Sequence, residues 1–204
     1  VVEGRYNLGF LNLRGLGVEL NTGQGVQLLE ECAQDGMVQA ALALHEQYSS
    51  GLYVPADPEA AARWLLRAAE MGSGGATLAL ADALDRRDAA APPAEYVVAL
   101  IERSAAQGDA AAQARLALWQ LEGRHVARDA RQAMLGFERA ARGGNAFAQA
   151  RLGDVLATGE GVEVDRVAAE IWYERAALQG HAGATLALTN MRMAAGADAT
   201  QLAA

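Results

Sequence analysis

Hydrophobic residues along this chain recur at helical spacing. In two runs the apolar positions fall at i, i+3, i+4, i+7 and i+8: Ala61, Trp64, Leu65, Ala68 and Ala69, and again Ala169, Trp172, Tyr173, Ala176 and Ala177. This spacing places the apolar side chains in one stripe of an amphipathic helix. A shorter stripe passes through Ala148, Leu152 and Leu156. The pattern therefore predicts pairs of helices, a shorter one followed by a longer one.

Evenly spaced glycines give the period of the pattern. Five of them stand 36 residues apart: Gly36, Gly72, Gly108, Gly144 and Gly180. A leucine also recurs at this interval, and we expect Leu44, Leu80, Leu116 and Leu152 to fill the core. Self-similarity at this period is typical of stacked helical repeats. We predict an all-α chain with a single solenoid domain over 1–204, in units of about 1–36, 37–72, 73–108, 109–144 and 145–180, with a partial sixth unit at 181–204.

Turn residues mark the ends of the predicted helices. Gly15, Gly51, Gly123 and Gly159 stand where the first helix of a unit should end in a left-handed residue. Asn21, Asp57, Asp129 and Asp165 stand where their side chains would accept from free amides of the second helix. Gln24 and Gln132, three residues after a cap, resemble a capping box. In the third unit Arg87 replaces the glycine and Pro93 the cap, which predicts a looser turn.

The fifth unit carries a recognisable signature. It contains Ala148-x-x-x-Leu152-Gly153, then Gly159-x-Gly161-Val162-x-x-Asp165, then Ala169-x-x-Trp172-x-x-x-Ala176-Ala177-x-x-Gly180. This resembles the Sel1-like repeat, a relative of the tetratricopeptide repeat. The resemblance implies a right-handed α-solenoid that serves as a non-enzymatic adaptor, often in bacterial signalling, envelope assembly or host contact. Some units depart from the signature; His45, Ala81 and Ala117, for example, stand where the fifth unit has Gly153.

Composition excludes several other classes of protein. The chain has 204 residues, 52% of them hydrophobic, and a net charge of −8, which is the wrong sign for broad contact with nucleic acid. All 17 basic residues are arginine, so a phosphate-binding loop lysine and a Schiff-base lysine are both excluded. There is no apolar run of transmembrane length. The lack of an initiator methionine or leader predicts a processed or trimmed chain, and the compartment stays open.

Residues that could support chemistry do not form a convincing centre. The single Cys32 has no disulfide partner, and the three histidines never fall at i, i+4, so we expect no metal and no cofactor. The four serines are Ser49, Ser50, Ser73 and Ser104, and none lies in a nucleophile elbow. We therefore expect no catalysis.

A binding surface is expected along the successive first helices, by analogy with tetratricopeptide grooves. We call the candidate residues the first-helix strip: Tyr6, Phe10, Leu42, Glu46, Leu78, Asp82, Asp85, Leu118, Leu121 and Asp154. A strip that mixes acidic and apolar residues would suit a protein segment in which arginine or lysine stands beside aliphatic residues. In the alternative interpretation these carboxylates only keep an exposed helix face soluble.

Other hypotheses remain open. Trp64 and Trp172 share one position of the repeat and are expected in the core, whereas Trp119 belongs either to the core or to the edge of the strip. Apolar residues of the sixth unit, Leu186, Leu188, Met191 and Met193, suggest a docking or self-association surface. The chain would then be an assembly component of a bacterial envelope, secretion or polysaccharide-export complex that docks through its ends or its convex face. A small-molecule binder or an enzyme is a more distant alternative.

Overall fold

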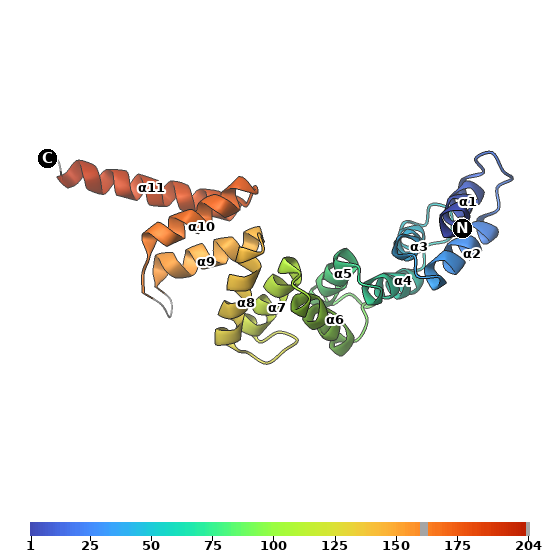
Figure 1. Ribbon diagram of the computed structural model, residues 1–204, viewed down its shortest axis with the longest axis horizontal. Helices are drawn as coiled ribbons and strands as arrows, with labels where there is room; N and C mark the ends of the chain where they lie inside the picture. The colour runs from blue at the N-terminus through green and yellow to red at the C-terminus, as the bar shows by residue number, and fades with distance from the viewer. Residues whose placement is uncertain (160–162, 203–204) are drawn as a thin grey trace. The chain divides into compact units, whose positions relative to one another are not determined.

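A computed structural model describes residues 1–159 and 163–202 of the chain, with side chains described as far as residue 194. Over these residues the chain forms eleven α-helices and no strand (Figure 1), which confirms the all-α prediction. The helices divide into two compact units, Val1–Ser104 and Ala105–Ala204. None of the described helices is both long enough and apolar enough to cross a membrane.

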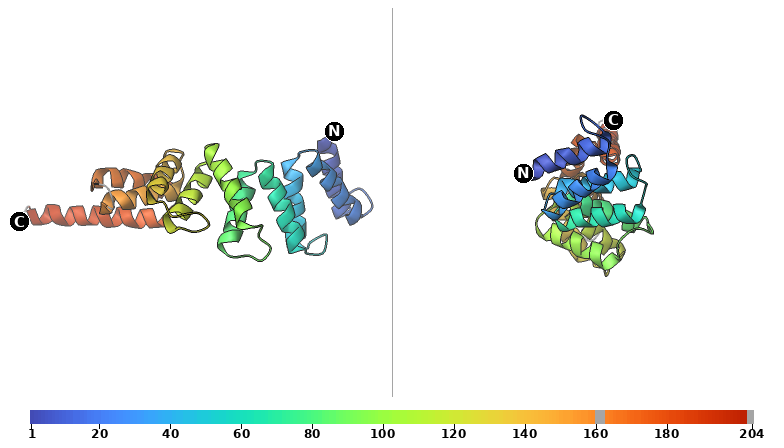
Figure 2. Two further views of the ribbon diagram at one scale, coloured as in Figure 1. Left: turned by 90° about the horizontal axis from the view of Figure 1, so that it is seen from below. Right: turned by 90° about the vertical axis from the view of Figure 1, so that its right-hand side faces the viewer.

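The first unit contains three helical hairpins. Its helices are α1 (Val2–Arg14), α2 (Thr22–Gln34), α3 (Val38–Ser50), α4 (Pro58–Glu70), α5 (Gly74–Asp85) and α6 (Ala94–Ala106), of which α6 runs into the second unit. Helix α1 packs on α2 and α3 packs on α4, while α2 and α4 each also contact the helix that follows. The loops after α1, α3 and α5 emerge at the same edge of this unit (Figure 2).

The second unit contains two hairpins and a final helix. Its helices are α7 (Ala110–Glu122), α8 (Ala130–Arg142), α9 (Ala146–Thr158), α10 (Arg166–Leu178) and α11 (Ala182–Leu202). Helices α7 and α8 form one pair and α9 and α10 the next, with α8 packed on α9 and α11 packed on α10. The sixth unit predicted from the sequence thus appears as one helix laid against the preceding hairpin.

One position of the repeat supplies a layer of the core. The second helix of every hairpin buries a large side chain at this position: Leu29, Leu65, Ile101, Phe137 and Tyr173. Leu44, Leu80 and Leu152 are buried opposite them, as predicted, and close-packed alanines fill the space between helices. Leu116 is only partly buried, so its assignment to the core is wrong.

The tryptophans also differ from expectation. Trp119 is fully buried, which decides in favour of the core, and its ring meets His125 edge to face at 4.9 Å. Trp64 and Trp172 are only half-buried. Because Trp172 lies beside the core cluster and under the Arg175 guanidinium, at 4.8 Å, it covers the core rather than filling it.

Helix ends follow the predicted turn chemistry. Gly15, Gly51, Gly123 and Gly159 end their helices with φ of 64°, 67°, 68° and 74°. The side chains of Asn21, Asp57, Asp129 and Asp165 each accept from a backbone amide three residues on. These residues therefore cap the second helices as the sequence predicts.

The capping-box interpretation is wrong. In a capping box the glutamine side chain would bond the backbone N–H of the cap residue. That N–H instead donates to a carbonyl of the preceding helix, from Asn21 to Asn12 at 3.0 Å and from Asp129 to Gln120 at 2.8 Å. Asp57 and Asp165 make the same bond to Tyr48 and Leu156. The bond ties the start of each second helix to its partner.

The third hairpin shows why this bond matters. Pro93 has no N–H, so its loop cannot be fastened in this way. Arg87 adopts a left-handed conformation with φ 58° in place of the glycine found elsewhere. The loop then continues through Asp88, whose carboxylate accepts from the Ala90 amide at 3.0 Å. The sequence predicts a looser turn here; the structure shows a loop from Arg86 to Pro93, one residue longer than the loops after α1, α3 and α7.

Candidate interaction surface

Every residue of the first-helix strip lies on the first helix of its hairpin. In the first unit α1 carries Tyr6 and Phe10, α3 carries Leu42 and Glu46, and α5 carries Leu78, Asp82 and Asp85; in the second unit α7 carries Leu118 and Leu121, and α9 carries Asp154. Glu46 is exposed and the others are partly buried, so all of them retain contact with solvent. Each unit thus presents its own section of the strip.

The section on α1 is aromatic. Tyr6 and Phe10 are one helical turn apart, and their rings meet edge to face at 5.1 Å. The Arg14 guanidinium lies 5.4 Å from the Phe10 ring and 5.9 Å from the ring of Tyr53, which comes from the loop after α3. Arg14 and Tyr53 therefore extend the strip. The spacing of Phe10 and Arg14 could have indicated Arg14, but no sequence signal places Tyr53 there.

Residues from neighbouring hairpins of the first unit approach each other in this section. Burial raises the pKa of Tyr6, and the negative charges of Glu46 and Cys32 raise it further. The Glu46 carboxylate forms no ion pair within the described part of the chain. An exposed carboxylate thus stands near an aromatic pair, which is an arrangement suited to a cationic side chain.

The section on α7 is apolar and shared with the core. Leu118 and Leu121 are partly buried and pack against the cluster that contains Phe137 and Leu152. Part of each side chain therefore stabilises the hairpin, and only the remainder is available to a partner.

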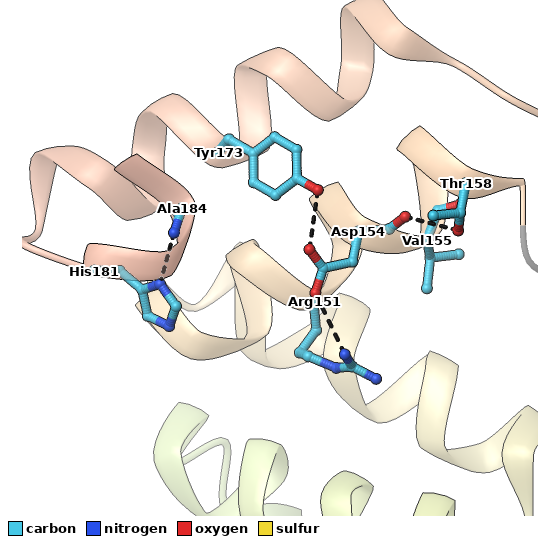
Figure 3. A network of polar contacts seen from close by, with 7 residues as sticks. All are labelled: Arg151, Asp154, Val155, Thr158, Tyr173, His181 and Ala184. Atoms are coloured by element: carbon cyan, nitrogen blue, oxygen red, sulfur yellow. Dashed lines mark hydrogen bonds and ion pairs between the residues drawn. The ribbon is translucent and has the colours of Figure 1, made fainter. Parts of the chain in front are cut away.

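Asp154 is engaged by its own unit. The Tyr173 hydroxyl donates to one carboxylate oxygen at 2.9 Å, and Arg151 donates to the other at 3.3 Å (Figure 3). The Thr158 hydroxyl donates to the Asp154 backbone carbonyl at 2.9 Å. Burial, followed by the hydrogen bond and charge of Asp154, raises the pKa of Tyr173. Asp154 consequently ties α9 to α10, which the sequence pattern did not reveal.

The histidines and the cysteine hold separate structural positions. His45 Nδ1 lies 2.9 Å from the Ala61 carbonyl oxygen, and His181 Nδ1 accepts from the Ala184 amide at the start of α11, at 3.1 Å (Figure 3). His125 adopts φ 59° in the loop after α7. Cys32 is buried, and burial raises the pKa of its thiol. The described residues include no group of three or more potential metal ligands.

Comparison with known proteins agrees with this architecture. A profile described as the Sel1 repeat matches residues 2–37, 36–73, 110–145 and 146–181. The irregular third hairpin lies between the two matched pairs. No curated protein matches the chain.

Solved structures of other proteins are also similar to this chain. A Sel1 repeat protein from Oxalobacter formigenes is similar with a TM-score of 0.72 and 25% identity, over 94% of this chain and 76% of that one. A protective antigen of uropathogenic Escherichia coli strains, which displays an SLR fold, gives a TM-score of 0.47 and 24% identity over 93% of this chain and 48% of that one. A Pseudomonas aeruginosa protein gives a TM-score of 0.48 and 18% identity over 90% of this chain and 67% of that one.

Members with this repeat are generally protein–protein interaction modules and are typically non-enzymatic scaffolds. Both the hairpin geometry and the matched segments, which span well over half of the sequence, lead to one conclusion: the chain belongs to the Sel1 repeat family.

Proposed function

We propose that the first-helix strip binds an extended segment of another protein, in which arginine or lysine stands beside aliphatic residues. The observation that carries this proposal is the section shared by α1 and α3. There the exposed Glu46 carboxylate lies within electrostatic reach of Tyr6, whose ring packs on Phe10. A cationic side chain would pair with Glu46, while an aliphatic neighbour would cover the exposed parts of the aromatic rings.

The strip is an adaptor surface rather than a reactive centre. Its aromatic residues supply contact area at a low cost in side-chain entropy, and its carboxylates supply orientation. Leu42 and Leu78 are partly buried on α3 and α5 and continue the apolar contact along the same unit. A partner segment would thus contact several hairpins through small, repeated contributions.

A charge-reversal experiment tests the proposal. A library of random peptides would be selected for binding to the chain. The enriched peptides are expected to combine arginine or lysine with aliphatic residues. Glu46→Arg should weaken their binding at least tenfold, because it replaces an attractive contact by a repulsive one. Asp154 is unsuitable for this test, since its replacement would also remove the bonds from Tyr173 and Arg151.

Glu102→Arg on α6 is the matched control, because Glu102 is exposed on a second helix and the change in charge is the same. Its binding should remain at the level of the unmodified chain. Equal losses for Glu46→Arg and Glu102→Arg, or enrichment of acidic peptides, would contradict the proposal.

A second candidate function is assembly through α11. Leu186 and Met193 are each 63% exposed and stand seven residues apart, on one face of this helix. Leu188 and Met191, expected to be uncovered as well, instead pack within or against the core cluster of the second unit. Sedimentation at two concentrations tests self-association through Leu186 and Met193: a dimer lost in Leu186→Glu supports it, and a monomer at both concentrations refutes it.

A further inference from the structure

A histidine occupies a position at which the other hairpins have glycine or alanine. His45 corresponds to Gly9 and Gly153 in the repeat. A side chain at Gly153 would begin only 2.6 Å from the Tyr173 ring, and one at Gly9 would begin 3.1 Å from Leu29. In the second hairpin, His45 is accommodated because its ring lies half-buried beside α4 and reaches the Ala61 carbonyl at 2.9 Å.

This contact decides which ring nitrogen remains available. A carbonyl oxygen only accepts, so Nδ1 of His45 carries the hydrogen. Nε2 of the neutral ring is then a hydrogen-bond acceptor, and it has no hydrogen-bond partner among the described residues. Nε2 is not among the buried atoms without a partner, so it is accessible to water, and a ligand that displaces this water must supply a hydrogen bond of its own.

A cavity of about 300 Å³ lies beside the His45 ring, between α3, α4 and α5, and the loop after α5 borders it. Its walls include the apolar side chains of Leu65, Leu80 and Ala83. Exposed Arg86 and Asp88 stand at its rim. Apolar walls with few polar groups, at this volume, are typical of a site for a small ring or a single anchoring side chain.

The cavity adjoins a larger hollow of about 700 Å³, with which it shares Pro58 and Ala90. Tyr48 and the exposed Glu59 line the hollow. A chain attached to an occupant of the cavity therefore has room in the larger hollow, beside the Glu59 carboxylate. None of the residues of the first-helix strip lines the cavity.

We propose that this cavity is a second docking site, which receives a tyrosine side chain from a partner segment. The ring fills the apolar space, and its hydroxyl donates to Nε2 of His45. The flanking residues lie in the larger hollow, where an arginine or lysine pairs with Glu59. An aliphatic or phenylalanine side chain that displaced water from Nε2 would leave this atom without a partner. A carboxylate could pair with Arg86 at the rim but has no hydrogen to donate to Nε2.

Titration followed by amide NMR tests the site in the full chain. The probes are the capped peptide Gly-Arg-Tyr-Gly, the same peptide with phenylalanine, and free 4-methylphenol. The tyrosine peptide should saturably shift the amides of Ala61, Ala83 and Asp88. It should bind about 3- to 10-fold more tightly than the phenylalanine peptide, the range expected of one neutral hydrogen bond.

Two variants separate the features of the cavity. His45→Gly, which installs the residue present at this position in other folded hairpins, should abolish the preference for tyrosine over phenylalanine. Ala83→Leu narrows the cavity and should weaken both peptides at least tenfold. Ala99→Leu, the same change at an exposed position of α6, is the control and should leave binding unchanged.

Each other outcome overturns the proposal. Equal affinity for the two peptides would show that His45 does not select tyrosine. The absence of saturable shifts at these amides would show that the cavity is not a docking site. If 4-methylphenol binds as tightly as the tyrosine peptide, the cavity serves a small molecule rather than a partner segment. Glu46→Arg should not alter tyrosine-peptide binding, so failure here and failure of the first-helix strip are distinguishable.

Discussion

Single side chains join the two helices of a hairpin in this protein. Tyr173 fills the core layer with its ring and fixes Asp154 with its hydroxyl. His45 similarly joins α3 to α4 through the Ala61 carbonyl. Gln47 is the exception, because its buried Oε1 has no hydrogen-bond partner among the described residues.

Replacing Gln47 by methionine should stabilise the chain. Methionine has a similar shape and removes a buried acceptor that costs about 1 kcal/mol or more when unsatisfied. We expect the free energy of unfolding, measured with urea, to rise by about 1 kcal/mol. Gln39→Met, at an exposed position of the same helix, should change it little. A loss of stability in Gln47→Met would show that this oxygen does have a partner in solution.

The Tyr173 hydroxyl should make stability depend on alkaline pH. Its pKa is raised above the ordinary value of 10.0, so the folded state favours the neutral phenol. The corresponding stabilisation is complete below about pH 10 and decreases above it, because only the unfolded chain then releases the proton readily. Near neutral pH Tyr173→Phe should cost about 1 kcal/mol through loss of the hydrogen bond to Asp154.

Comparing the unmodified chain with Tyr173→Phe separates the effect of Tyr173 from the effects of Tyr6 and Tyr48, whose pKa values are also raised. Between pH 8 and pH 10.5 the unmodified chain should lose more stability than Tyr173→Phe. Parallel loss in the two would contradict the assigned role of the hydroxyl.

At the scale of the helix pair, close approach is controlled by small residues at fixed positions. Gly153 allows α9 to meet the Tyr173 ring of α10, and alanines such as Ala140 and Ala148 do the same between α8 and α9. Such contacts explain why helices of 13 residues, which would be marginal alone, are stable together.

Gly153→Ala should therefore destabilise the chain by about 1 to 3 kcal/mol, because the new Cβ would lie 2.6 Å from the Tyr173 ring. Gly75→Ala in α5 is the matched control. Its Cβ would meet nothing within 4 Å, so the higher helix propensity of alanine should stabilise the chain by up to about 1 kcal/mol. Thermal unfolding of both variants measures the difference, and a neutral Gly153→Ala would refute the close contact.

Many features of the individual helices could be predicted from the sequence. The terminal glycines and capping residues of four hairpins can be identified because their effect is local, within three or four residues. The partial burial of Leu116 and Trp172, the role of Asp154 and the bond from Asp57 to Tyr48 could not be predicted, since each depends on how one helix meets another. The cavity beside His45 likewise requires three helices to be in place.

At the scale of the whole molecule, the hairpins of each compact unit are repeated with small differences, and the binding surfaces that we propose lie at those differences. The first unit carries the aromatic and acidic section at Tyr6, Phe10 and Glu46 and also the irregular loop at Arg87. The net charge of the whole chain, −8, favours basic partners at long range. Under the proposed function, the side chains on the first helices select the segments that bind.

Site-specific photo-crosslinking in the native cell tests the central claim most directly. A photoreactive phenylalanine would replace Phe10 on the first-helix strip, or Tyr96, which is 59% exposed on α6. We predict that Phe10 crosslinks to a discrete partner protein through a peptide with arginine or lysine beside aliphatic residues, and that Tyr96 does not. Partner crosslinks at Tyr96 with none at Phe10 would contradict the assignment of function to the first helices.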